Sequence, residues 1–108
     1  MIERFTPDVL IIEDIFSAPS IPRTAILMGH ARAAVCLAGR RQRIALVSVA
    51  PAEVKRAVTA SGGAPKAQVA RAMQALLALS ALPRPSHVAD ALALAYTGLS
   101  RARGLAAR

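Results

Sequence analysis

Aromatic residues, cysteine and acidic residues are all scarce in this 108-residue chain. Aromatics make up 3% of it, namely Phe5, Phe16 and Tyr96, so the core must be built from aliphatic side chains. The single cysteine, Cys36, cannot form an internal disulfide, which favours a reducing cytoplasm. Its Ala-rich surroundings favour a buried small side chain over a nucleophile.

Long uncharged apolar runs are missing as well. The longest, Ala72–Pro83, contains Gln74 and Ser80 and falls short of the ~18 residues that a membrane span needs. The N-terminus does not combine a basic flank, an apolar stretch and a small-residue cleavage site, so it is not a secretory signal. We therefore expect a cytoplasmic protein without a membrane partner.

Basic residues dominate the charge of the chain. Fourteen lysines and arginines against six acids give a net charge of +8. This excess favours a polyanionic partner, nucleic acid first and an anionic membrane second, and a solvated basic surface is the alternative. The hydrophobic fraction of 55% is enough for a folded core, and the length suits one domain over residues 1–108.

Hydrophobic periodicity predicts an α/β chain with two strands and about four helices. Val9–Ile12 is an unbroken β-favouring run that suits a strand covered on both faces and ending near Glu13. The two strands would be parallel and form only part of a sheet. The predicted order is strand 9–13, helix 24–41, strand 44–49, and helices 52–59, 65–79 and 87–100, with a basic tail after them.

The helix predicted over Thr24–Arg41 is apolar nearly all round. Ile26, Leu27, Ala34 and Leu37 occupy one side, and further apolar residues occupy another. Such a helix is typically buried on two sides. The sheet can cover one of them, and we expect a second copy of the chain to cover the other.

Three polar side chains fall where a metal site would form. Glu13 ends a strand, and in α/β sheets ligands collect at the carboxyl ends of strands. His87 and Asp90 are three residues apart and share one face of the last helix. Carboxylates with one imidazole suit Mg²⁺ or Mn²⁺. The alternative is structural: Glu13 in solvent at a strand end, and His87 or Asp90 capping a helix.

Three further residues could contact nucleic acid. Lys55 and Lys66 are the only lysines and flank one glycine-containing loop, where a helix N-terminus with a lysine can bind a backbone phosphate. The loop does not match a nucleotide-binding P-loop. Phe16, just beyond Glu13, could stack on an unpaired base. Solvated lysines and a Phe16 folded onto the core are the alternatives.

Four segments, in this order and at this spacing, resemble the RuvC-type Holliday-junction resolvases. The first ends in Glu13 and is followed by Phe16, and the next is similar to the opening of that family's dimerisation helix. The third is similar to the family's two-lysine DNA-binding region, and the fourth to its final acidic motif. They are Phe5–Phe16, Gly29–Arg32, Pro51–Lys55 with Ala64–Val69, and His87–Ala93.

The resemblance implies an RNase H-like fold and a homodimer, formed through Thr24–Arg41, that nicks four-way DNA junctions in recombination and repair. It implies two Mg²⁺ or Mn²⁺ ions per active site, with Glu13, His87 and Asp90 as metal ligands and catalytic residues. Lys55 and Lys66 would contact DNA, and Phe16 would stack in the opened junction. A branch-migration complex is the further partner that the family implies.

Some features depart from the family pattern. His87 stands where many members carry aspartate, and Ala33 replaces a common glycine. The family's first strand, which carries a metal-ligating aspartate, and the two strands after it have no counterpart here. We therefore expect an incomplete RNase H-like domain that is inactive by itself. The alternatives are an inactive shortened relative that binds DNA and dimerises, and a half-enzyme completed by a separate chain.

Overall fold

The computed structural model describes residues 2–14 and 22–106, and among these the chain forms seven elements. The contacts divide the chain into two compact units, Met1–Ser48 and Val49–Arg108. The elements are α1 (Ile2–Phe5), β1 (Val9–Glu13), α2 (Pro22–Arg41), β2 (Ala45–Val49), α3 (Pro51–Thr59), α4 (Lys66–Leu76) and α5 (Ser86–Ala106).

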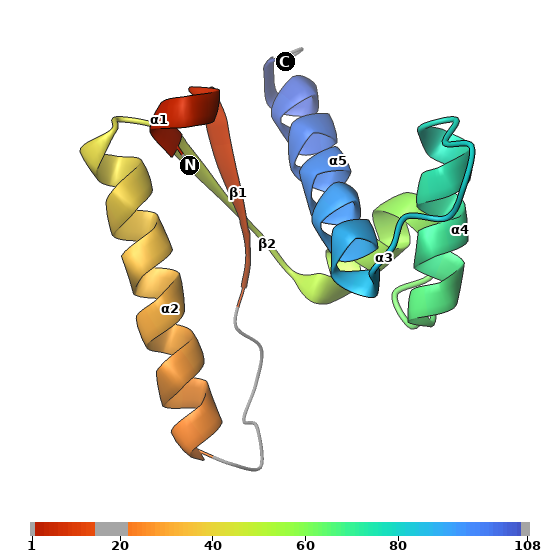
Figure 1. The fold of residues 1–108 in the computed structure, drawn as a ribbon, viewed down its shortest axis with the longest axis horizontal. Coiled ribbons are helices and arrows are strands. Elements are labelled where there is room, and N and C mark those ends of the chain that lie inside the picture. The colour runs from red at the N-terminus through yellow and green to blue at the C-terminus, as the bar shows by residue number, and fades with distance from the viewer. Residues whose placement is uncertain (1, 15–21, 107–108) are drawn as a thin grey trace. The chain divides into compact units, whose positions relative to one another are not determined.

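The first unit is a strand–helix–strand arrangement. β1 and β2 are hydrogen-bonded neighbours that run in the same direction, and α2 connects them (Figure 1). Gly39 is buried where α2 crosses the strands, and a Cβ there would lie 2.9 Å from Leu10 Cδ2 and 3.1 Å from Leu46 Cδ2. Side chains alternate along a strand, so Leu10, Ile12 and Asp14 share the face that carries α2.

The close approach at Gly39 gives a stability prediction with a matched control in the same helix. A Cβ at Gly29 would meet nothing within 4 Å, so Gly29→Ala should gain only helix propensity. Gly39→Ala gains the same propensity but crowds the terminal methyl groups of two half-buried leucines, so the cost should be at the lower end of the about 1–3 kcal/mol that overpacking causes. Urea unfolding followed by circular dichroism should rank Gly39→Ala below Gly29→Ala by about that amount. Equal stabilities would contradict this packing of α2.

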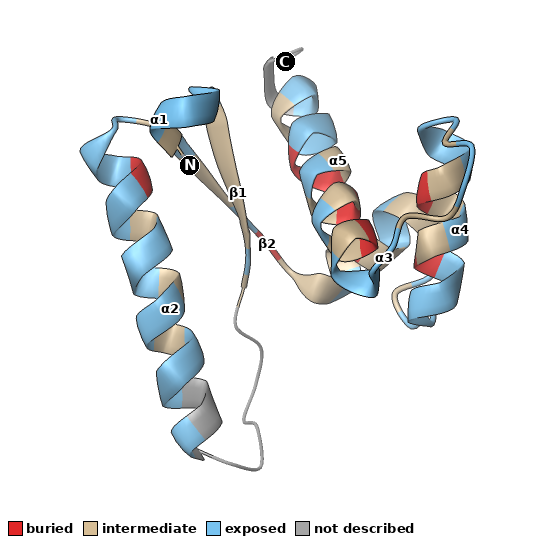
Figure 2. Cartoon of the chain, viewed as in Figure 1, coloured by how far each residue is buried: buried red, intermediate tan, exposed pale blue. Residues whose placement is uncertain are grey.

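The second unit is a cluster of α3, α4 and α5, in which each helix packs on the other two. Helical spacing directs its apolar side chains inward, and buried residues lie along α4 and α5 (Figure 2). Met73 and Ala93 are fully buried. The buried Thr97 satisfies its hydroxyl within α5, because Oγ1 donates to the Ala93 carbonyl at 2.8 Å. The other buried apolar residues of these three helices and their connections are Val54, Ala64, Val69 and Ala89.

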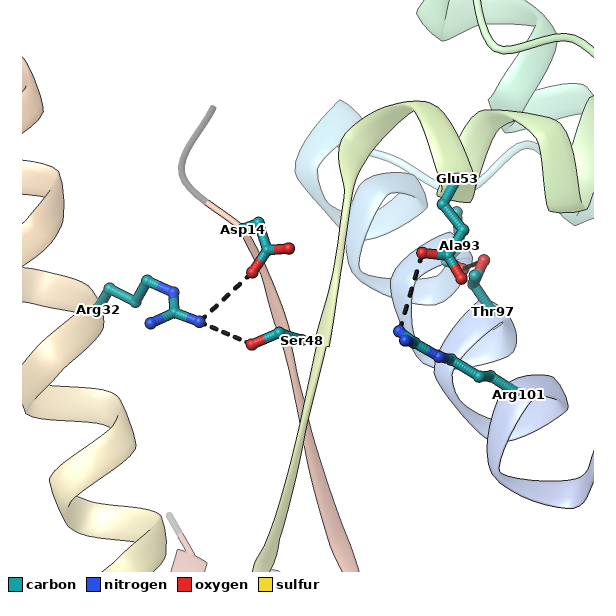
Figure 3. Close-up of polar contacts among 7 residues, drawn as sticks. All are labelled: Asp14, Arg32, Ser48, Glu53, Ala93, Thr97 and Arg101. Carbon is teal, nitrogen blue, oxygen red and sulfur yellow. Dashed lines mark hydrogen bonds and ion pairs between the residues drawn. The ribbon is translucent and has the colours of Figure 1, made fainter. Parts of the chain in front are cut away.

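The structure confirms the predicted order of strands and later helices and corrects several bounds. α1 was not predicted, and the described residues therefore contain five helices in place of about four. The predicted end of the last helix at 100 and its basic tail are wrong, because α5 continues to Ala106 and Arg101 lies within it. Arg101 Nη1 pairs there with Glu53 Oε2 of α3 at 3.8 Å, which supports the added turn (Figure 3).

α4 is shorter than predicted. It ends at Leu76, and Ala78 adopts a left-handed conformation with φ 53°. The Leu79 amide donates to the Gln74 carbonyl at 2.9 Å, which satisfies one of the last free carbonyls of the helix. No described helix is both long and apolar enough to cross a membrane.

Candidate metal and nucleic-acid site

Glu13 lies where the sequence predicts it. It is the last residue of β1 and is exposed, and it makes no ion pair within the described residues. The other two acids in apolar sequence, Asp14 and Asp90, each have a basic partner. An unpaired carboxylate at the carboxyl end of a parallel strand is available to a cation.

A polar cluster that was not predicted lies on the α2 side of the strands. Arg32 of α2 donates from Nη2 to Ser48 Oγ of β2 at 2.7 Å, and the same nitrogen lies 3.5 Å from Asp14 Oδ1 (Figure 3). Asp14 follows the last residue of β1. The guanidinium therefore connects the carboxyl ends of the two strands. The partners lie 18 and 16 residues away in sequence, and no local pattern gives such a pairing.

His87 and Asp90 are in the first turns of α5, as predicted. His87 is exposed, and the Asp90 side chain is 44% exposed. Asp90 Oδ2 lies 3.6 Å from Nζ of Lys66, the first residue of α4. A predicted metal ligand and a predicted DNA contact are therefore ion-paired within one unit, which the sequence did not indicate. Because the lysine side chain is 75% exposed, water screens the pair and it adds little stability.

The second unit has a hollow of about 310 Å³ beside Lys66, between the first turns of α4 and α5. Lys66, Arg84 and Ser86 line it together with apolar residues. The first turns of α4 and α5 lie at this hollow, and the partial positive charge of a helix N-terminus favours anions. Lys55 lies half-buried in α3, where its carbonyl accepts a hydrogen bond from Thr59 Oγ1 at 2.6 Å. Arg84 was not among the predicted site residues.

The predicted metal ligands are divided between the two units. Glu13 belongs to the first, and His87 and Asp90 belong to the second. No group of three or more His, Cys, Asp or Glu placed to hold a metal ion occurs in the described part of the chain. The donor types nevertheless suit Mg²⁺ or Mn²⁺, and all three side chains are reachable from solvent. Their convergence stays a prediction, and Phe16 lies outside the described residues.

A family model and individual relatives match this chain under the same family name. A family model for crossover junction endodeoxyribonuclease RuvC matches residues 1–98. The protein of that name from Rhodopirellula baltica is 42% identical over 84% of this chain, and the one from Carboxydothermus hydrogenoformans is 41% identical over 92%. This chain spans 51% and 62% of the lengths of these two relatives.

Solved structures agree with the sequence comparison. Thermus thermophilus RuvC has a TM-score of 0.77 and 34% identity, and its complex with a Holliday junction substrate has a TM-score of 0.85 and 35% identity. Each match covers 94% of this chain and 61% of the other. The likeness confirms the α/β, RNase H-like fold class that the resemblance implied. The chain belongs to the RuvC family of crossover junction endodeoxyribonucleases.

Proposed function

We propose that this chain is part of a structure-specific endonuclease that nicks four-way DNA junctions in recombination and repair. One observation carries the proposal: 94% of the chain superimposes, with a TM-score of 0.85, on a RuvC structure described in complex with a Holliday junction substrate. The net charge of +8 supports a DNA partner independently of that likeness. The longer relatives carry the activity by name, and for this chain it is a proposal.

Glu13, His87 and Asp90 are proposed to hold the catalytic metal, Mg²⁺ or Mn²⁺. When bound, such ions supply hydroxide and stabilise the attacking and leaving oxygens of phosphodiester hydrolysis. Within the second unit, Lys66 neutralises Asp90 at 3.6 Å. A lysine beside a carboxylate in this way can move to a DNA phosphate when the carboxylate takes another cation, because the ion pair is exposed and weak.

Lys66 and Lys55 are proposed to contact backbone phosphates. Lys66 lines the hollow at the start of α4 and α5, where helix N-termini add positive potential, and Arg84 stands at the same hollow. Phosphate contacts fix orientation and carry no base sequence information. Phe16 is proposed to stack on a base in the opened junction, a role that rests on the family resemblance alone.

Neutralising either lysine should weaken binding to junction and duplex DNA alike. Each phosphate contact releases about one counterion, so Lys55→Ala or Lys66→Ala should reduce the slope of log K against log salt by ~1. Fluorescence anisotropy at several salt concentrations measures this slope. Gln68→Ala is a control on the exposed side of α4 that removes no charge and should leave the slope unchanged. An unchanged slope for both lysine variants would show that neither lysine contacts a DNA phosphate.

α2 is proposed to form the homodimer contact. Most of α2 is exposed in the single chain (Figure 2). Its apolar residues away from the sheet share this exposure, and Leu27 and Leu37 are each 60% exposed. A helix with apolar residues on both sides needs a cover on the second side. A second copy supplies one, and it would bring a second active site for the opposed strand of a junction. A branch-migration complex remains the further partner proposed from the family.

The second candidate function is a DNA-binding protein without catalysis. The absence of a three-ligand cluster among the described residues favours it. A third is a half-enzyme that a separate chain completes. The test uses two forms of the protein: the chain alone, and the chain fused behind the segment that precedes the matched region in a longer relative. Each form is incubated with a labelled four-way junction and Mg²⁺. We expect binding in both forms and cleavage only in the fusion, and binding without cleavage in both would favour the second candidate.

A further inference from the structure

Arg32 of α2 is half-buried and contacts side chains at the carboxyl ends of both strands. Its side chain is 32% exposed, and one nitrogen, Nη2, reaches residues from both strands. The Nε atom is buried and has no hydrogen-bond partner in the described part of the chain. A buried donor without a partner costs stability. The guanidinium is therefore held in this position although its own hydrogen bonds are incomplete.

The place of these contacts is the end of the sheet where Glu13 lies. Asp14 follows β1 directly, and Ser48 is the penultimate residue of β2. Leu10 and Leu46 meet α2 earlier along the strands, at Gly39. Beyond these leucines, Arg32 provides a polar connection from α2 to both strands. Glu13 and Arg32 line one hollow of about 300 Å³ together with other residues of β1 and α2. Holding Asp14 against α2 therefore also fixes Glu13, the residue before it.

We propose that Arg32 is a positioning residue for Glu13. It connects Asp14 and Ser48 and so fixes the carboxyl ends of β1 and β2 relative to each other, which sets the direction of the Glu13 carboxylate. The proposal rests on the proposed metal role of Glu13 for its functional consequence. The connection between the strands does not depend on that role, so the two can be tested separately.

Because Arg32 is positively charged, its removal can either tighten or weaken metal binding, and the direction of the change tests the proposal. A cation close to a metal-binding carboxylate disfavours a divalent ion by Coulomb repulsion, so removing it should tighten metal binding if it does nothing else. A positioning residue gives the opposite result. Loss of a group that orients a metal ligand weakens metal affinity by about 10-fold or more.

The first measurement is amide hydrogen exchange on the full chain. In Arg32→Met, exchange of the amides of residues 12–14 and 47–49 should be faster by about 10-fold, the equivalent of one charge-assisted hydrogen bond. Amides around Met73 belong to the second unit, and their exchange should not change. Arg40→Met removes the same charge from an exposed position of the same helix and is the control. Unchanged exchange at the strand ends in Arg32→Met would overturn the proposal.

The second measurement is Mn²⁺ binding, followed by electron paramagnetic resonance of the free ion. Arg32→Met should bind Mn²⁺ about 10-fold more weakly than the unaltered chain, and Arg40→Met should bind it equally or slightly more tightly. Tighter binding by Arg32→Met would overturn the positioning role. If the unaltered chain binds no Mn²⁺, the proposed metal site fails, and hydrogen exchange alone decides on Arg32. If Arg32→Met does not fold, Arg32→Lys replaces it. The lysine ammonium keeps the charge but lacks the planar guanidinium fork. Arg32→Lys should therefore change amide exchange and Mn²⁺ binding in the same direction, by a smaller factor.

Discussion

Replacing Asp90 by asparagine should reduce junction cleavage by about 10³-fold or more while junction binding changes only slightly. Asparagine keeps the size of the side chain but loses the charge that a divalent cation needs. The fold should tolerate the change, because Asp90 is 44% exposed and its only described partner is the exposed Lys66. Cleavage is measured with the chain fused behind the preceding segment of a longer relative, in gel assays with a labelled junction.

The matched control for Asp90 is Asp8→Asn. Asp8 is an exposed acid just before β1, at the opposite end of the strand from Glu13, and the substitution removes the same charge. It should leave the cleavage rate within a factor of about two, because surface substitutions away from special features have small effects. A cleavage rate for Asp90→Asn equal to that of the Asp8 control would remove Asp90 from the mechanism.

Introducing a charge on the outer side of α2 should abolish dimerisation. Leu37 is 60% exposed in the single chain, and the proposed contact would bury it against a second copy. Leu37→Glu buries an unpaired charge in that contact, which should weaken the dimer by about 100-fold or more. Sedimentation velocity over a concentration series measures the dissociation constant.

Leu99→Glu is the control for this dimerisation prediction. Leu99 is 51% exposed on α5, so the substitution adds the same charge to a comparable apolar surface in the second unit. The dimer should survive it. Dissociation of both variants would show that added negative charge alone separates the subunits, and a dimer that persists in Leu37→Glu would exclude α2 as the contact.

Local patterns in the sequence were enough to predict the elements that carry the site. The run Val9–Ile12 ends at Glu13 because a charged residue follows four β-favouring ones, and β1 ends there in the structure. His87 and Asp90 follow the proline-rich stretch that separates α4 from α5, and their spacing of three residues places them on one face. In each case the signal lies within a few residues.

The ion pairs near the candidate site that the sequence did not indicate join residues far apart in the chain. Asp14 and Arg32 are 18 residues apart, and Lys66 and Asp90 belong to different helices. Such pairs depend on how helices and strands pack, which hydrophobic periodicity does not specify. The end of α4 was missed for another reason. Ala78 takes a left-handed conformation although alanine favours helices, and the backbone capping bonds stabilise it there.

We propose that this chain carries metal-binding and DNA-binding residues of a junction-cleaving enzyme. The most direct measurement maps the nicks that the fused chain makes in a four-way junction with Mg²⁺, using each strand labelled in turn. We expect paired nicks at symmetric positions of two opposed strands, no nicks in matched duplex, and no cleavage by the Asp90→Asn variant. Stable junction binding with no nicks in any strand, at any Mg²⁺ or Mn²⁺ concentration, would contradict it.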